Sequence, residues 1–122
     1  MSKSKNTYPE LIAQKLLDEI GVKYTLHNKK LPGTPDIFIK NLKLVIFVHG
    51  CFWHKHSCQK INKDDQIIID KDVKIIEEIK ELGYVPIILW ECDLLKNQIQ
   101  AKNKLKYLIE KLNNQILAEA LE

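Results

Sequence analysis

Residues 47–58 read FVHGCFWHKHSC and constrain this chain more than any other segment. The eight positions from Cys51 to Cys58 hold two cysteines, two histidines and a Phe-Trp pair, and His49 lies two residues upstream. A segment that only fills a core does not need so many metal ligands and bases. A third cysteine, Cys92, follows much later in the motif WEC. The pattern predicts a hydrolytic metal site built beside a structural zinc.

The composition indicates one globular domain over residues 1–122. Apolar residues make up 45% of the chain, and no apolar run approaches the roughly 18 residues that a membrane span requires. Residues 1–7 are polar, lack the apolar core of a signal peptide and are expected to form a flexible tail. We therefore expect a cytoplasmic protein with no membrane partner. An odd count of three cysteines argues against a disulfide framework and favours metal ligation in a reducing compartment.

All 19 basic residues are lysines, and the chain has no arginine. Arginine is the usual bidentate reader of guanine, whereas lysine acts as a point charge on phosphate. Any contact with DNA is therefore expected to rely on backbone phosphates and DNA shape. A compositional bias towards Lys, Ile and Asn is the alternative explanation, and the net charge of +3 does not by itself identify a nucleic-acid partner.

Hydrophobic periodicity predicts the order αβββαβα, which is typical of an α/β fold with a mixed sheet flanked by helices. Residues 44–48 form a continuous apolar run, as expected for a strand buried on both faces. Residues 84–90 are also expected to be a buried strand. Pro86 has no N–H to donate, but it lies near the start of this strand and limits the main-chain pairing mainly there. Residues 59–66 are polar and expected to be irregular. Helices are predicted over residues 9–20, 70–82 (apolar face Val73, Ile76, Ile79 and Leu82) and 94–121, and the other strands over residues 22–26 and 36–39.

Cys51, His56 and Cys58 fall within one tight loop, and Cys92 follows the last predicted strand. Together they supply the three cysteines and one histidine of a closed tetrahedral zinc site. Such a site would tie the loop after one central strand to the end of another and would contribute directly to the free energy of folding. The alternative is that the cysteines are buried free thiols that behave as small hydrophobic side chains.

His49 and His54 are candidates for catalysis, because histidine is a natural general base near neutral pH. Asp36 follows Pro35 at the start of a predicted strand, where a carboxylate can bind a hard cation such as Mg²⁺. Phosphodiester hydrolysis needs a metal to polarise the phosphate and a base to activate water. Each feature also has a purely structural explanation, because a lone histidine is usually structural and Pro-Asp is common in turns.

Three motifs in this order resemble those of the very-short-patch repair (Vsr) mismatch endonucleases: LPGTPD at residues 31–36, FVHGCFWHKHSC at residues 47–58, and WEC at residues 90–92. The resemblance covers residues 10–92 and is most specific in its middle. It implies a PD-(D/E)XK-like fold and a Mg²⁺-dependent endonuclease that nicks one DNA strand at T:G mismatches. It also implies mismatched double-stranded DNA as the partner, mismatch-repair proteins as further partners, and a monomer acting at the bacterial nucleoid.

The resemblance also implies roles for individual residues. By position, Asp36 resembles the metal-binding aspartate, His54 the base that activates water, and His49 a second active-site histidine at the scissile phosphate or a metal-bound water. Glu10 resembles the acidic residue that completes the constellation, and the main-chain carbonyl of Val48 matches a Mg²⁺ ligand. The implied structural zinc ligands are Cys51, His56, Cys58 and Cys92, and the implied DNA-binding residues are Phe52 and Trp53, as an aromatic wedge, and Lys55.

The chain departs from the family pattern between Cys58 and Cys92, where it is shorter. Residues 59–69 contain no aromatic side chain that would extend the wedge. T:G recognition is therefore open, and a restriction or homing type of endonuclease without mismatch specificity is an alternative, with recognition supplied by another chain or by a dimer. A third possibility is a zinc-stabilised DNA-binding module without catalysis. The full set of Asp36, His49 and His54 argues against that third possibility.

Overall fold

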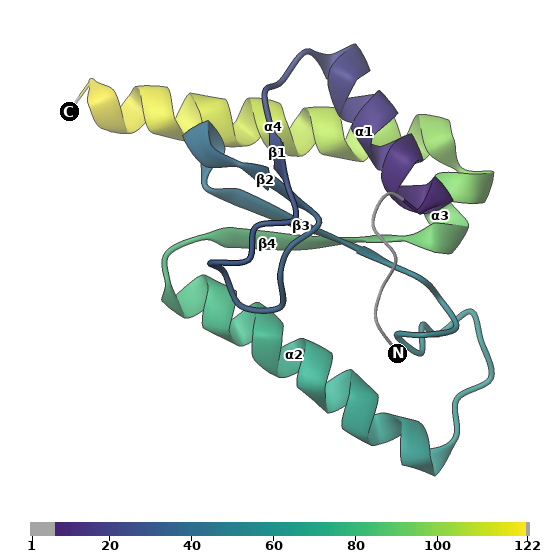
Figure 1. Cartoon of the computed structure of the whole chain (residues 1–122). Helices are drawn as coiled ribbons and strands as arrows, with labels where there is room; N and C mark the ends of the chain where they lie inside the picture. The colour runs from purple at the N-terminus through teal and green to yellow at the C-terminus, as the bar shows by residue number, and fades with distance from the viewer. Residues whose placement is uncertain (1–6, 122) are drawn as a thin grey trace.

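A computed structural model describes residues 7–121 of the chain (Figure 1). Thr7 belongs to the predicted tail and precedes the first helix, and the rest of that tail lies outside the described residues. None of the helices within residues 7–121 is both long enough and apolar enough to cross a membrane. In chain order the elements are α1 (Tyr8–Ile20), β1 (Thr25–Leu26), β2 (Ile37–Ile39), η1 (Lys40–Leu42), β3 (Leu44–His49), η2 (Lys63–Asp65), α2 (Gln66–Glu81), β4 (Val85–Trp90), α3 (Glu91–Lys96) and α4 (Gln98–Ala120).

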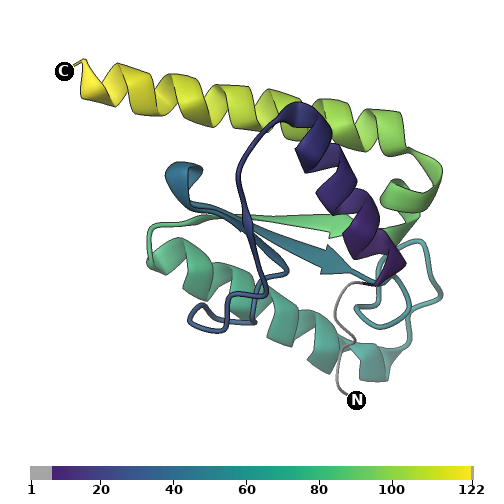
Figure 2. The same cartoon turned by 45° about the horizontal axis from the view of Figure 1, so that its top comes forward.

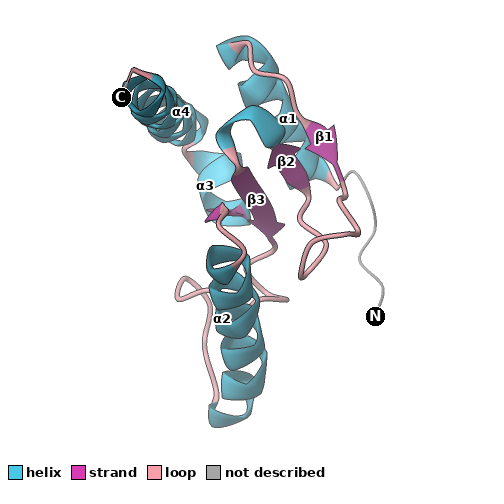
Figure 3. Cartoon of the chain, turned by 90° about the vertical axis from the view of Figure 1, so that its left-hand side faces the viewer, coloured by secondary structure: helices cyan, strands magenta, loops and turns pink. Residues whose placement is uncertain are grey.

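The strands within residues 7–121 form one sheet in the order β1-β2-β3-β4, with α1, α3 and α4 on one side and α2 on the other (Figures 1 and 3). The pairs β1–β2 and β2–β3 are antiparallel, whereas β3 and β4 are parallel, as their arrows show in Figure 2. A parallel pair requires a crossover connection, and α2 supplies it. The C-terminal ends of β3 and β4 therefore meet at the same edge of the sheet, at His49 and Trp90.

The central strand β3 confirms the predicted buried run, because all six of its residues are buried. Successive side chains of a strand point to opposite faces. Ile46 and Val48 accordingly join the larger core beneath α1, α3 and α4, whereas Val45 and Phe47 join a smaller core beneath α2. His49 follows Phe47 at the same spacing, so the strand directs its ring towards the α2 side, at the end of the sheet.

The edge strand β4 corrects one expectation. Residues 84–90 do contain a strand, but all six residues of β4 are half-buried and not buried. Because β4 ends the described sheet, one side of its backbone pairs with no strand within residues 7–121. That position accommodates Pro86, which has no N–H to donate and lies opposite Val45. At the other edge, the predicted strand 22–26 is reduced to Thr25–Leu26.

Helix α2 begins before the predicted start at residue 70, and part of the segment expected to be irregular is ordered. Asn62 and Asp65 form a capping box, in which the side chain of each accepts from the main-chain N–H of the other. The Asn62 N–H lies 2.8 Å from Asp65 Oδ2. Such a box satisfies N–H groups that have no helical partner. The short turn η2 therefore leads directly into Gln66 and α2.

The expected apolar face of α2 is only partly used. Ile79 is buried in the smaller core, and Ile75 and Ile76 pack partly against that core. Val73 and Leu82 are 50% and 57% exposed, so the prediction that they share this buried face is wrong. The helix therefore contacts the sheet through few apolar side chains.

The predicted C-terminal helix over residues 94–121 is broken into two helices. Asn97, with φ −133° and ψ 47°, separates α3 from α4. Asparagine is a weak helix former, because its side chain competes for main-chain hydrogen bonds. The break lets two helices of different direction contribute to one core: Leu94 of α3 and Leu105 and Ile109 of α4 are all buried in it.

Candidate active site and metal cluster

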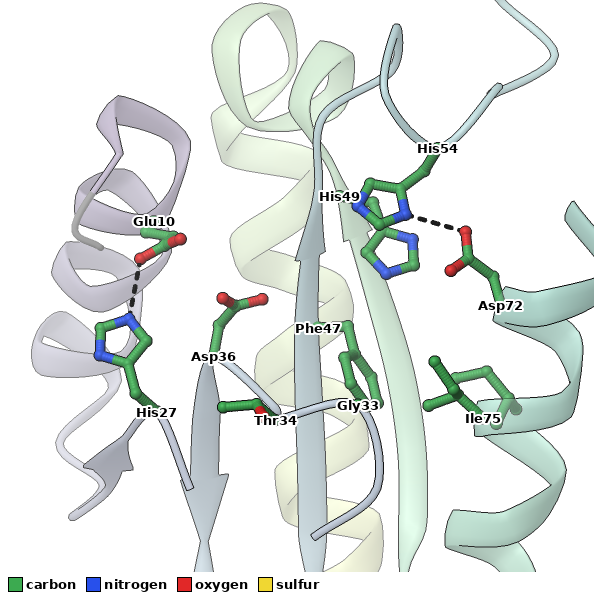
Figure 4. A pocket seen from close by; sticks show the side chains of 11 residues that line it. Glu10, His27, Gly33, Thr34, Asp36, Phe47, His49, His54, Asp72 and Ile75 are labelled. Carbon is green, nitrogen blue, oxygen red and sulfur yellow. Dashed lines mark hydrogen bonds and ion pairs between the residues drawn. The ribbon is translucent and has the colours of Figure 1, made fainter. Parts of the chain in front are cut away.

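A pocket of about 220 Å³ lies where β3 ends, between α1 and α2 (Figure 4). Six of the residues that line it carry a carboxylate or an imidazole. The sequence predicts four of them as site residues, and the structure brings these four together: Glu10, Asp36, His49 and His54. It adds two that the sequence analysis missed, His27 and Asp72.

Asp36 is buried at 3% exposure and is anchored to the neighbouring strand. Its Oδ2 accepts a hydrogen bond of 2.7 Å from the main-chain N–H of Val48. The register explains this contact: β2 begins at Ile37, which pairs with Ile46, so β3 extends beyond the start of its neighbour. The carboxylate takes the place of the missing main-chain acceptor. A hydrogen bond to a charged group is also stronger than one between neutral groups.

The LPGTPD motif brings its loop close beneath α2. Gly33 has φ +73°, a left-handed conformation that favours glycine. A Cβ at this position would lie 2.6 Å from Cγ2 of Ile75 and 3.1 Å from Cε1 of Phe47. Thr34 is also left-handed, at φ +47°. The glycine therefore permits both the turn and the close approach that precede Asp36.

The two predicted catalytic histidines lie face to face. The rings of His49 and His54 are stacked, with centroids 3.6 Å apart and planes 5° apart. His54 Nδ1 lies 2.8 Å from Oδ2 of Asp72 on α2 (Figure 4). A carboxylate accepts only, so Nδ1 carries the proton in this pair and Nε2 is the basic nitrogen of a neutral His54 ring.

The sequence spacing around Asp72 carries a signal for its place in the pocket. Asp72 precedes Ile76 and Ile79 by four and seven residues, the spacing of one helix face. That face is the one that reaches the smaller core and the pocket. An acidic residue in the inward stripe of a helix is a candidate for a polar function, because burial of a charge requires a partner.

His27 lies across the pocket from this pair, beside α1 (Figure 4). Its Nε2 is 3.1 Å from Oε2 of Glu10, a carboxylate in the first turn of α1 that is 1% exposed. No sequence motif predicts a site role for His27. Its φ of +50° is the one local feature that sets it apart, and that feature is visible only in the structure.

The four predicted zinc ligands form one cluster. One ligand atom each from Cys51, His56, Cys58 and Cys92 lies within 4.8 Å of the others. Nδ1 of His56 faces all three sulfurs, at 3.6 Å from Cys51, 3.2 Å from Cys58 and 3.5 Å from Cys92. All three cysteines are free thiols. Three sulfurs around one imidazole nitrogen are a donor set that suits a tetrahedral metal site.

The protonation of the thiols depends on whether a cation is bound. Burial raises the pKa of Cys51 to about 12 and also raises that of Cys92. Desolvation raises the pKa of Cys58 as well, but hydrogen bonds from Gln59 and His56 outweigh it and lower the value to about 7. Without a cation, then, Cys51 and Cys92 keep their protons at neutral pH. A coordinated metal reverses this, because it stabilises the thiolates directly.

Each residue of the WEC motif contacts the loop that carries the cluster. The ring of Trp90 stacks on His56, with centroids 4.1 Å apart, and meets the ring of His49 edge-on at 5.2 Å. Glu91 Oε1 accepts from the N–H of Cys51 at 3.2 Å. Cys92 supplies the remaining sulfur. The indole ring of Trp90 therefore joins the cysteine–histidine cluster, at His56, to the candidate catalytic residue His49.

The predicted DNA-binding residues lie at the surface of the same loop. Phe52 and Trp53 are 59% and 57% exposed, and their rings meet edge-on at 5.1 Å. Nζ of Lys55 lies 4.6 Å from the centre of the Phe52 ring and 3.6 Å from Oδ1 of Asp65. Two adjacent exposed aromatic rings on a loop are a feature of recognition surfaces.

Comparison with known proteins identifies relatives of this arrangement. The family model described as DNA mismatch endonuclease Vsr matches residues 1–60. The type II nicking enzyme V.NmeAIP of Neisseria meningitidis is 32% identical, over 93% of this chain and 87% of the relative. The DNA mismatch endonuclease Vsr of Escherichia coli K12 is 31% identical, over 98% of this chain and 75% of the relative. The type II nicking enzyme V.XorIIP of Xanthomonas oryzae is 38% identical, over 75% of each protein.

A solved structure shares the fold. The chain described as the homing endonuclease I-Bth0305I catalytic domain superimposes with a TM-score of 0.58 over 90% of this chain and 94% of that one. The sequence identity is 21%, so this likeness bears on the fold alone.

Proposed function

Because the chain belongs to the Vsr family of DNA mismatch endonucleases and is a DNA endonuclease, we propose that it nicks one strand of duplex DNA at a T:G mismatch, in very-short-patch repair and with Mg²⁺. One observation carries the proposal: the buried carboxylate of Asp36 lines the same pocket as the stacked rings of His49 and His54. A carboxylate suited to a hard cation and a histidine suited to proton transfer are the two requirements of metal-assisted phosphodiester hydrolysis.

The donor set fits Mg²⁺, which prefers oxygen ligands and usually takes one or two protein carboxylates. Asp36 and Glu10 each place a carboxylate oxygen within the 4.8 Å group that also includes His27. Val48 directs its N–H to Asp36, and within a β-strand the N–H and C=O of one residue point towards the same side. We therefore assign Asp36 and the Val48 carbonyl as the residues that would hold Mg²⁺, with Glu10 beside them. When bound, the ion polarises the scissile phosphate.

His54 is the proposed general base. Asp72 holds the proton on Nδ1, which leaves Nε2 to accept a proton from water as the water oxygen forms its bond to phosphorus. In the same step the bond between phosphorus and the leaving oxygen breaks; that oxygen departs with the electron pair and takes up a proton from solvent. His49 lies flat against His54 and meets the ring of Trp90 edge-on, and its proposed role is a contact to the scissile phosphate or to a metal-bound water.

The cluster of Cys51, His56, Cys58 and Cys92 is proposed to hold structural Zn²⁺. It joins the loop after β3 to the start of α3, and so it orders the segment that carries His54. We also propose the PD-(D/E)XK-like fold class, in which Asp36 precedes the strand next to β3. Monomeric action and stimulation by mismatch-repair proteins are predictions from the family resemblance.

Phe52 and Trp53 are the proposed wedge. Insertion of apolar rings between base steps costs a few kcal/mol of stacking energy, and a mispaired step lowers this cost. The exposure of both rings and the support of Phe52 by Lys55 favour this role. Lys55 is partly buried and lies 3.6 Å from Oδ1 of Asp65, and we propose that its ammonium contacts a DNA phosphate, as the all-lysine composition predicts.

A second candidate function is cleavage without mismatch specificity. The segment between Cys58 and the start of α2 carries no aromatic residue, so these two rings are the whole aromatic wedge in this loop region. If two rings do not suffice to detect a mispair, the same chemistry would act on matched DNA.

Two labelled duplexes test the proposal, one with a T:G mismatch and one with T:A at the same position, each incubated with the protein and Mg²⁺. The expected result is one nick, in one strand, of the mismatched duplex only. Asp36→Asn is the matched control, because its amide oxygen can still accept from the Val48 N–H while the charge is lost. Cleavage of both duplexes would support the second candidate. Equal cleavage by Asp36→Asn would overturn the assignment of the site.

A further inference from the structure

We infer that His27 is a positioning residue of the active site, which holds the carboxylate of Glu10 towards Asp36. The inference rests on the proposed function, and it concerns a residue for which the sequence motifs predict no role. Three independent features support it: the strand register, the main-chain conformation of His27, and the contact between its ring and Glu10.

The strand register places His27 directly opposite Asp36. β1 and β2 pair with Leu26 opposite Ile37, so the next antiparallel pair is His27 and Asp36. The His27 N–H donates to the Asp36 carbonyl at 3.0 Å, and the Asn28 N–H donates to the Pro35 carbonyl at 3.2 Å. These two bonds close the loop over residues 27–36 at its base. The main chain of His27 is therefore fixed relative to the proposed metal ligand.

The conformation of His27 directs its side chain to α1. With φ +50°, His27 lies in the left-handed region, which a residue with a Cβ adopts at a cost in conformational energy. Such strain persists only where the surrounding structure holds it, and it concentrates at functional sites. The left-handed conformation ends the regular alternation of side chains between the two faces of β1. The ring then reaches Glu10.

The ring contact meets a need of the buried carboxylates. Glu10 and Asp36 are 1% and 3% exposed, and both belong to one group of closely spaced ligand atoms. Two like charges in a buried site repel, and a buried carboxylate is costly without a hydrogen-bond donor. His27 Nε2, at 3.1 Å from Glu10 Oε2, can supply that donor. Its ring is 17% exposed, so it also borders the pocket.

The site thus has a histidine–carboxylate pair on each side of Asp36. Figure 4 shows His27 and Glu10 on one side, and His54 and Asp72 on the other. The second pair is proposed to move a proton. The pair of His27 and Glu10 belongs to the same group of ligand atoms as Asp36. A partner that fixes the orientation of a carboxylate there improves metal binding.

The test compares two substitutions at residue 27 in the full chain. His27→Asn tolerates the left-handed conformation but is too short to reach Glu10. His27→Gln places an amide NH₂ near the position of the imidazole Nε2 and can donate to Glu10. Lys23→Ala, an exposed change just before β1, is the control. Thermal melting and zinc content establish that each variant is folded.

The first measurement is equilibrium binding of Mn²⁺, followed by electron paramagnetic resonance without DNA. We expect His27→Asn to weaken Mn²⁺ binding by about 10- to 100-fold, the usual effect of removing a residue that orients a metal ligand. His27→Gln should recover most of the affinity, and Lys23→Ala should match the wild type. Unchanged Mn²⁺ affinity in His27→Asn would overturn the inference.

The second measurement is the Mg²⁺ dependence of nicking. His27→Asn should require more Mg²⁺ for half-maximal nicking and should approach the wild-type rate at saturating Mg²⁺. A loss of nicking at every Mg²⁺ concentration, with normal Mn²⁺ binding, would show that His27 acts on the proton or the phosphate and would also overturn the inference. If the wild type itself does not nick, the proposed function fails, whereas Mn²⁺ binding still decides the role of His27.

A third measurement needs no substitution. In the NMR spectrum of the wild-type protein, Mn²⁺ bound beside Glu10 and Asp36 should broaden the ring signals of His27 at low occupancy. Ring signals of His27 that stay sharp while Mn²⁺ binds would contradict the inference, even if the variants failed to fold.

Discussion

Nδ1 of His54 lies 2.8 Å from Oδ2 of Asp72, and the two residues belong to segments that meet only in the folded chain. His54 follows β3 in the cluster loop, whereas Asp72 lies on the crossover helix α2. The pair fixes which ring nitrogen of His54 carries a proton. The position of α2 therefore determines which nitrogen of a neutral His54 ring is free to accept a proton.

Asp72→Asn should lower the single-turnover nicking rate by about 10²- to 10⁴-fold, the range associated with loss of a general base. The asparagine amide can donate to Nδ1, which leaves the proton of a neutral ring on Nε2, where the base is needed. Asp70→Asn is the control, because Asp70 lies on the exposed side of α2 and pairs with Gln66. Equal rates for wild type and Asp72→Asn would exclude His54 as a base oriented by this carboxylate.

Gly33→Ala should lower the free energy of unfolding by more than the cost of placing an alanine in a left-handed backbone conformation. The left-handed backbone alone costs an alanine about 1–2 kcal/mol. Gly83→Ala measures that part by itself, because Gly83 has φ +90° and no atom within 4 Å of an added Cβ. At Gly33 the Cβ would also meet Ile75 at 2.6 Å, which should add about 1–3 kcal/mol of overpacking. Urea unfolding of both variants gives the difference, and equal losses would show that the loop and α2 move apart freely.

Cys92→Ser should lower zinc retention and thermal stability together. Cys92 is the proposed ligand contributed from beyond β4, so its loss should open the cluster that joins the two strand ends. EDTA, in melts without Mg²⁺, should lower the melting temperature of the wild type towards that of Cys92→Ser and should leave the variant nearly unchanged. Ser57→Ala, an exposed change within the same loop, should retain zinc. Full zinc occupancy in Cys92→Ser would remove Cys92 from the ligand set.

The main effect of Trp53→Ala should be reduced discrimination between T:G and T:A duplexes. Its effect on folding stability should be the smaller one. An aromatic ring that stacks on a base contributes about 1–3 kcal/mol, so nicking of the mismatched duplex should fall by about 5- to 150-fold at limiting protein. Tyr107→Ala is the control, because Tyr107 is 69% exposed on α4, which lines no part of the pocket. Unchanged selectivity in Trp53→Ala would locate mismatch detection elsewhere.

The parts of the fold that follow from local sequence were predictable. The apolar run over residues 44–48 predicts a strand buried on both faces, because such a strand needs no polar alternation. Three of the four cluster residues are also close in sequence, at Cys51, His56 and Cys58, so their spacing predicts a metal cluster that Cys92 would complete. Sequence comparison of the motifs then identifies the family.

The remaining features depend on tertiary packing. Asp72 reaches His54 only because α2 crosses the sheet, and His27 reaches Glu10 only because its main chain is left-handed. The break at Asn97 is likewise set by the core that α3 and α4 share, since the apolar pattern continues across it. The prediction that Val73 is buried is wrong. Its spacing matches an apolar face of α2, but the sheet does not cover that part of the helix.

The parallel pairing of β3 and β4 has a kinetic consequence for the cluster. Cys92 joins the other three ligands only after β4 has docked beside β3, across a connection that includes all of α2. Long-range parallel pairing is slow, because the chain loses loop entropy before the contacts form. The complete ligand set is therefore a late product of folding. Interactions that form after the transition state mainly slow unfolding, so a metal in this cluster should extend the lifetime of the folded chain far more than it speeds its folding.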